Sequence, residues 1–264
     1  MAGPKSGRKR SADAMRNFKV TLAYDGTEYS GWQVQPDAAT IQGTLASAIG
    51  RITGEKVLPQ GSGRTDAGVH ALAQVASFSI ESSIPAENLA KALNDILPSS
   101  IRILAATEVP VEFHARKSAR EKTYQYRIHR APICPPFLAR YTWHYPFPLD
   151  ENAVGRGAEH VLGEHDFTSF AAVDPERRND EEIRSNVRVI SKSEWRRDHD
   201  EFVYTVRGNG FLHHMVRNLV GTLMLVGKGT INPDEIAAIL RACNRSRAGA
   251  TAPASGLYLV SVEY

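Results

Sequence analysis

Cysteine is nearly absent from this chain, and so is any long apolar run. The 264 residues include two cysteines, Cys134 and Cys243. Two are too few for a disulfide framework or a four-ligand zinc site, so we expect a reducing, cytoplasmic environment. No uninterrupted apolar run approaches the roughly 20 residues that a membrane-spanning helix needs, so no membrane partner is expected. Apolar residues nevertheless make up 42% of the chain, which excludes disorder over most of its length.

The chain also has little net charge, and that charge is unevenly distributed. Lysine and arginine total 32 against 29 acidic residues, a formal net charge of +3. Residues 1–17 hold five bases and one acid, a net +4, which leaves the remainder at −1. This segment lacks the apolar stretch of a secretory signal, and we expect a disordered basic tail. An electrostatic arm for a polyanion is the alternative interpretation.

Two further segments are strongly charged. Residues 112–130, EFHARKSAREKTYQYRIHR, hold six bases against two acids, with tyrosines between them. They fit either a strand with a solvated basic face or a surface whose cations neutralise phosphates while tyrosines stack on unpaired bases. Residues 172–186 contain almost no large apolar side chain. They predict a surface loop, and a loop that a substrate orders is the alternative.

Apolar periodicity predicts the elements of the first half. Alternation from Phe18 to Tyr24 predicts a strand, and helical spacing from Ile41 to Ile52 predicts a helix that ends at Gly54. A short strand near Val57, a strand over 75–80, a helix over 89–97 and a strand over 101–109 follow. The resulting order, β-α-β-β-α-β, is typical of a ferredoxin-like unit with an antiparallel sheet.

The second half repeats this order more loosely. We expect strands over 122–129 and 257–264, a helix over 150–162, a hairpin of 187–195 with 201–207, a packed helix over 212–224, and a helix that starts at 232–235. The fold class is therefore α+β. Two ferredoxin-like (RRM-like) halves, residues 18–110 and 111–264, share a mainly antiparallel sheet with helices on one face.

One segment stands out as a candidate site: GSGRTDAGVH, residues 61–70. Glycines let a ligand approach the backbone closely, and a carboxylate held there, Asp66, can act as a nucleophile that a neighbouring guanidinium keeps ionised. A turn in which Asp66 bonds its own backbone is the simpler interpretation. The segment is not a P-loop, because the GK[ST] ending is absent and no helix follows.

Several blocks together resemble the tRNA pseudouridine synthase A (TruA) family, whose signature GRTDAGVHA occurs here at 63–71. The other matching blocks are YDG at 24–26, YSGWQ at 29–33, FHAR at 113–116, YQYR at 124–127, FLHHMVRN at 211–218 and TAPASGLYL at 251–259. They run in order from about residue 18 to the C-terminus. Lys117, which follows FHAR, departs from the aromatic residue that is common there in the family.

The resemblance implies an isomerase that converts uridine to pseudouridine in the anticodon stem-loop of tRNA, at roughly positions 38–40, after flipping the base out of its stack. It implies that Asp66 is the nucleophile and that Arg217 pairs with it. It also implies that Tyr124 is a catalytic residue that stacks on the flipped uracil and is a candidate for removing the C5 proton. It further implies that Arg64 engages RNA and that Leu257 forms an apolar wall against the base. Family members are homodimers in which one tRNA contacts both subunits, so a homodimer is expected. No redox change occurs, so no cofactor is implied.

The pair His213–His214 raises the question of a metal. Adjacent helical residues point in different directions, and no His-Glu-x-x-His pattern is present. We therefore expect no metal site, and we expect these histidines to pack against the strand of the site.

Two other functions are compatible with parts of the pattern. A non-catalytic RNA-binding module of RRM-like halves would bind through exposed aromatics, but no evident RNP1 pattern is present and the GRTDAG block would be unexplained. An aspartate-based hydrolase of small glycosides lacks an obvious second carboxylate at the motif. We expect the basic residues of 112–130, together with Arg64 and Arg217, to line one cleft.

Overall fold

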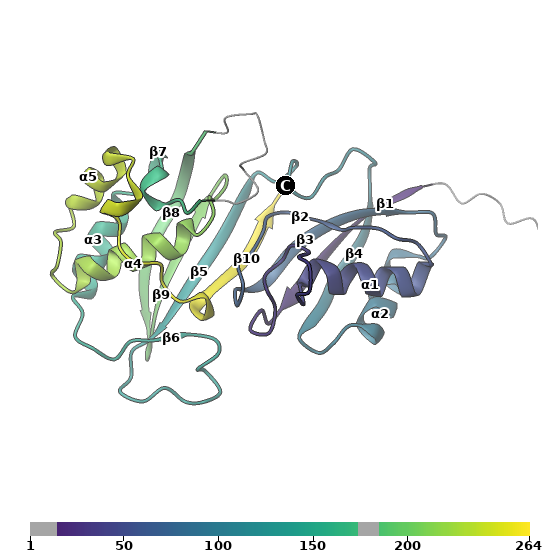
Figure 1. Ribbon diagram of the computed structural model, residues 1–264, viewed down its shortest axis with the longest axis horizontal. Coiled ribbons are helices and arrows are strands. Elements are labelled where there is room, and N and C mark those ends of the chain that lie inside the picture. The colour runs from purple at the N-terminus through teal and green to yellow at the C-terminus, as the bar shows by residue number, and fades with distance from the viewer. Residues whose placement is uncertain (1–14, 174–184) are drawn as a thin grey trace, which may run out of the picture.

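The computed structural model describes residues 15–173 and 185–264 (Figure 1). Most of the expected basic tail, residues 1–14, lies outside the described part of the chain, and so do residues 174–184 of the expected charged loop. The first half contains β1 (Arg16–Tyr24), α1 (Ile41–Thr53), β2 (Gln60–Gly61), β3 (His70–Ile80), α2 (Ala86–Ile96) and β4 (Ile101–Val109). This is the expected β-α-β-β-α-β order.

The second half contains more elements and ends in the middle of the sheet. Its elements are β5 (Glu121–His129), β6 (Trp143–His144), α3 (Glu151–Glu159), β7 (Gly163–Asp166), β8 (Val187–Asp198), β9 (Glu201–Gly208), α4 (Met215–Gly227), α5 (Glu235–Ala242) and β10 (Leu257–Glu263). Short 3-10 turns lie at Thr168–Phe170, Arg245–Arg247 and Ala254–Gly256. Figure 1 shows α1 and α2 over one end of the sheet and α3, α4 and α5 over the other.

One sheet runs through both halves in the order β4-β1-β3-β10-β5-β9-β8-β7. Every pairing along this path is antiparallel except that of β3 with β10, where Tyr258 lies opposite His70 and Leu259 opposite Ala71. The C-terminal strand is thus inserted between β3 of the first half and β5 of the second half. The expected fold class is confirmed: an α+β protein with a shared, mainly antiparallel sheet.

Some expected boundaries are wrong. β1 begins at Arg16, inside the expected tail, because the Arg16 guanidinium binds Glu108 of β4 at 2.5 Å. The strand expected near Val57 lies at Gln60–Gly61 instead. The helix expected from 212 begins at Met215, because His214 has a left-handed backbone (φ 58°). The helix expected to start at 232–235 does start in that segment, at Glu235, whose carboxylate accepts from the backbone N–H of Asn232.

Helix α4 is the most deeply packed helix of the described chain, with eleven of its residues buried. Its packing depends on a close backbone approach. A Cβ added at Gly221 would lie 1.8 Å from the carbonyl oxygen of Ala250, so only glycine fits there. This contact fixes the segment 249–252 against the helix. Among the described residues, no helix is long and apolar enough to cross a bilayer.

We predict that Gly221→Ala lowers the free energy of unfolding by about 2–3 kcal/mol, because the added methyl group forces α4 away from segment 249–252. Urea denaturation measures this. Gly155→Ala in α3 is the matched control, because nothing lies within 4 Å of its added Cβ. Alanine there should stabilise the helix by about 0.5–1 kcal/mol. Equal stability of Gly221→Ala and the unmodified protein would contradict the close approach.

Candidate functional site

A cavity of about 680 Å³ opens between the two halves. The first half contributes the loop between β2 and β3. The second half contributes one face of β5, the segment that leads into α4, and the first residue of β10. The residues used below that line it are Gly63, Arg64, Asp66, Arg116, Lys122, Tyr124, Phe211, His213, His214 and Leu257.

Asp66 and Arg217 form an ion pair at this cavity, across the boundary between the halves. Nη1 of Arg217, in the first turn of α4, donates to Oδ2 of Asp66 at 2.8 Å. The two side chains are only 17% and 15% exposed. A partly buried pair of this kind is screened little by solvent, so it fixes the orientation of the carboxylate.

Backbone contacts hold both partners of the pair in place. Nε of Arg217 donates to the carbonyl of Ala252 at 2.8 Å, and the Ala252 N–H donates back to the Arg217 carbonyl. On the other side, the Trp32 N–H donates to the carbonyl of Thr65. Gly31 (φ 90°) permits this approach, since a Cβ there would lie 2.5 Å from that same carbonyl oxygen. The YSGWQ block therefore supports the loop that carries Asp66.

Tyr124 and Leu257 provide the less polar wall of the cavity. Tyr124 lies on β5, 7% exposed, with the ring of Phe211 edge-on at 4.9 Å. Burial, with smaller contributions from Tyr24 and Asp66, raises the pKa of the Tyr124 phenol well above its usual value. Tyr124 therefore carries its proton at neutral pH. Leu257 is the first residue of β10 and is 6% exposed.

Three cations line the cavity beside these groups: Arg64, Arg116 and Lys122. Nζ of Lys122 donates to the carbonyl of Ser62 at 2.6 Å. Burial, and then repulsion from Arg116 and Arg188, lowers the pKa of Lys122 to about 8. Lys122 was expected at the cleft only as one of the basic residues of 112–130. A sharper signal existed: it precedes Tyr124 by two positions on a strand, so both lie on one face.

The expectation that the basic residues of 112–130 line the cleft is only partly right. Arg116 and Lys122 line it, but Arg127 binds Glu201 at 2.5 Å on the neighbouring strand β9. Arg130 binds Glu151 at the start of α3. Arg127 lies on the face of β5 opposite to Lys122 and Tyr124, because side chains alternate along a strand. Arg130 follows the last residue of β5 and so lies beyond the strand.

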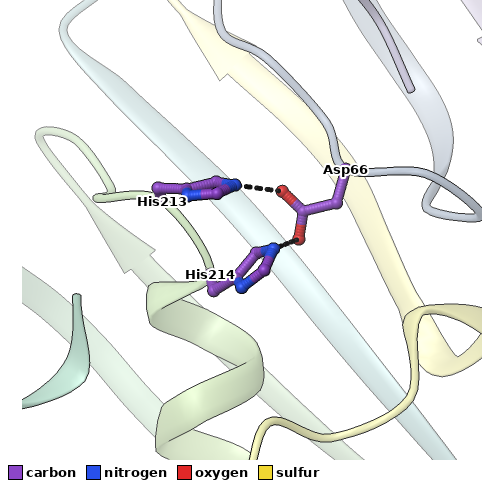
Figure 2. Close-up of side chains that lie close together, drawn as sticks. All are labelled: Asp66, His213 and His214. Atoms are coloured by element: carbon purple, nitrogen blue, oxygen red, sulfur yellow. Dashed lines mark ion pairs between the residues drawn. The ribbon is translucent and has the colours of Figure 1, made fainter. Parts of the chain in front are cut away.

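His213 and His214 do not pack in the way that the sequence suggested. Both rings point at the carboxylate of Asp66 (Figure 2). Nε2 of His213 lies 3.7 Å from Oδ1, and Nε2 of His214 lies 3.4 Å from Oδ2. The premise that neighbouring helical residues diverge fails, because both precede α4 and His214 has a left-handed backbone. Burial, and then the charges of His213, Arg217 and Arg245, lower the pKa of His214 against the opposing effect of Asp66.

Asp25, in the YDG block, is held by hydrogen bonds in a turn beside the site. Its Oδ1 accepts from the backbone N–H and the hydroxyl of Thr27, and its Oδ2 accepts from the Tyr141 hydroxyl at 2.9 Å. Burial opposes ionisation, but these hydrogen bonds outweigh it and lower the pKa of Asp25. The residue thereby ties the first half to the loop before β6.

Comparisons with known proteins agree with one another. The model of a family described as tRNA pseudouridine synthase matches residues 21–116 and 158–264. A protein of Solibacter usitatus named tRNA pseudouridine synthase A is 53% identical over 250 residues, which are 95% of this chain and all of that protein. The protein of the same name from Brevibacillus brevis is 46% identical over 250 residues, with the same shares covered.

We predict that the ion pair couples the two halves energetically. In a double-mutant cycle of Asp66→Asn and Arg217→Met, the coupling free energy should be about 1–2 kcal/mol, because the partly buried pair also orders the contacts of Arg217 with Ala252. Urea denaturation of the four proteins measures it. The exposed pair Lys192–Glu194 is the control and should couple by under about 0.5 kcal/mol. Additive effects of Asp66→Asn and Arg217→Met would contradict this prediction.

Proposed function

The chain belongs to the tRNA pseudouridine synthase family, and from this premise we propose how its cavity acts on tRNA. The protein is an isomerase that converts uridine to pseudouridine in tRNA. In this reaction the bond between the ribose and N1 of uracil breaks, the base turns, C5 bonds to the ribose and loses its hydrogen as a proton, and N1 takes up a proton. Atoms and electrons balance within the nucleotide.

We propose that Asp66 is the nucleophile, and one observation carries this proposal. Its carboxylate lines the cavity while Arg217 holds one of its oxygens at 2.8 Å. Oδ2 takes that hydrogen bond, whereas His213 lies 3.7 Å from Oδ1, beyond hydrogen-bond range. Within the described residues, Oδ1 is therefore the less strongly held oxygen, and we assign it the attack.

The cavity also supports a flipped base. A uridine stacked inside an RNA helix cannot reach a carboxylate between two protein halves, so the nucleotide must swing out. A volume of about 680 Å³ accommodates a nucleotide. We propose that the uracil stacks on Tyr124 with Leu257 as the opposing wall. Arg64, which is exposed at the rim, then contacts the RNA.

The raised pKa of Tyr124 limits its role. A phenol that keeps its proton at neutral pH is a poor base, although it remains a good stacking surface and hydrogen-bond donor. We therefore propose that Tyr124 acts mainly by stacking. Once the bond between C5 and the ribose has formed and the carboxylate of Asp66 is free again, that carboxylate is the better acceptor for the proton from C5.

We further propose the anticodon stem-loop, at roughly positions 38–40, as the target, with a cytoplasmic homodimer as the working form. The motif blocks that resemble the TruA family support these finer assignments. The cations Arg64, Arg116 and Lys122 would neutralise phosphates around the flipped nucleotide.

We predict that Asp66→Asn slows pseudouridine formation by at least about 1,000-fold, because the amide cannot replace the nucleophile. The assay uses unmodified tRNA that carries tritium at uridine C5 and measures label released to water. The unmodified protein should release label, and Asp95→Asn, an exposed acid on α2, should match it. Normal release by folded Asp66→Asn would overturn the assignment. Tight tRNA binding with no release by any protein would favour a non-catalytic RNA-binding module.

We predict that tRNA binding weakens as the pH rises from 7 to 9, because Lys122 loses its charge near pH 8. A bound phosphate favours the protonated amine, so affinity is highest below this pKa and falls above it. Filter binding at constant ionic strength measures the trend. Lys122→Met should bind more weakly at pH 7, with a salt slope smaller by about one.

Two variants isolate this effect. Lys122→Arg keeps its charge throughout and should lose the pH dependence. Lys91→Met removes an exposed lysine on α2 and should leave both affinity and pH dependence unchanged. The same loss of affinity with pH in Lys122→Arg and the unmodified protein would exclude Lys122 as its source.

A further inference from the structure

Three metal-binding side chains converge at one point of the cavity. The ligand atoms of Asp66, His213 and His214 all lie within 4.8 Å of one another. Figure 2 shows both imidazole rings directed at the carboxylate, from the segment that precedes α4. The arrangement depends on the left-handed backbone of His214, so it could not be predicted from a zinc-binding sequence motif.

The hydrogen bonding of His213 leaves its other nitrogen available as a ligand. Nδ1 lies 3.2 Å from the carbonyl of Val173, which can only accept, so Nδ1 carries the proton. In the neutral ring, Nε2 then presents a lone pair to Oδ1 of Asp66. A backbone carbonyl behind a histidine is the usual outer partner of metal-bound imidazoles, since it fixes both tautomer and orientation.

The spacing suits a small transition-metal ion. Bonds of roughly 2.0–2.1 Å in tetrahedral geometry place ligand atoms about 3.3 Å apart. The observed separations are 3.7 Å from Oδ1 of Asp66 to Nε2 of His213 and 3.4 Å from Oδ2 to Nε2 of His214, and all the ligand atoms lie within 4.8 Å of one another. A modest rotation of the carboxylate would direct Oδ1 at the ion while Oδ2 keeps its hydrogen bond to Arg217.

We propose that Asp66, His213 and His214 form a binding site for Zn²⁺ or a similar first-row divalent ion, and that the bound ion inhibits the enzyme. A set of two imidazoles and one carboxylate suits such ions better than it suits Mg²⁺, which prefers oxygen ligands. The ligands are 17–32% exposed, so an ion in solution can reach them. The inhibitory part rests on the proposed function of Asp66, because a coordinated carboxylate is a weaker nucleophile and the ion fills space that the flipped base needs.

Binding is tested first, on the protein without tRNA. The background is Cys134→Ser with Cys243→Ser, which removes both free thiols as other ligands. Equilibrium dialysis against Zn²⁺ should give one ion per chain. Co²⁺ in its place should give the strong visible absorption of a four- or five-coordinate site, whereas hydrated Co²⁺ absorbs weakly.

Single variants in that background locate the ion. His213→Asn and His214→Asn should each weaken Zn²⁺ binding by at least about tenfold. His199→Asn is the matched control, because it removes a 97% exposed histidine whose Nε2 lies 3.9 Å from an aspartate oxygen of Asp198. It should bind as the background does. No binding at all, or equal binding by all four proteins, would overturn the site.

Inhibition is then measured by tritium release at saturating Mg²⁺. Zn²⁺ should slow the background and His199→Asn alike. Half-inhibition of His213→Asn, measured relative to its own rate without zinc, should need a Zn²⁺ concentration at least about tenfold higher than for the background. Binding without inhibition would overturn the inhibitory part alone. Failure of the proposed function would appear separately, as no label release in the absence of zinc.

Discussion

The ion pair between Asp66 and Arg217 is the constraint on which the site depends, because its partners belong to different halves of the molecule. Asp66 lies in the loop before β3, and Arg217 lies in α4. The same guanidinium holds the carbonyl of Ala252, just before β10 enters the sheet. The hydrogen bond from Arg217 therefore both orients the Asp66 carboxylate and fixes how the cavity residues of the two halves lie relative to each other. A fold whose halves were joined only by sheet hydrogen bonds would leave this geometry loose.

Much of the fold could be predicted because its signals are local. The alternation of β1, and the Gly54 stop of α1 at φ 80°, depend on a few neighbouring residues. The errors occur where distant contacts decide. Arg16 joins β1 because Glu108, far along the chain, binds it. Helix α4 starts late because tertiary packing holds His214 in a left-handed conformation, which costs a non-glycine residue about 1 kcal/mol or more.

The candidate site divides in the same way. Motif blocks pointed to Asp66, Tyr124, Arg217, Arg64 and Leu257, all of which lie in or beside the cavity. Lys122 could have been predicted as well, because it lies two positions before Tyr124 on the same strand and so shares its face. The direction of the His213 and His214 rings was not, because it depends on a single backbone dihedral and on the Val173 carbonyl.

The distribution of charge explains how a nearly neutral body can hold a polyanion. Toward the second half's side of the sheet, arginines are matched by carboxylates: Arg127 by Glu201, and Arg207 by Glu121 and Glu263. These pairs cancel in the net charge and contribute little field at a distance. The cations Arg64, Arg116 and Lys122 gather at the cavity, near a carboxylate that Arg217 engages. In the proposed function, the attraction for phosphate depends on where the cations gather, and the overall charge of the chain says little about it.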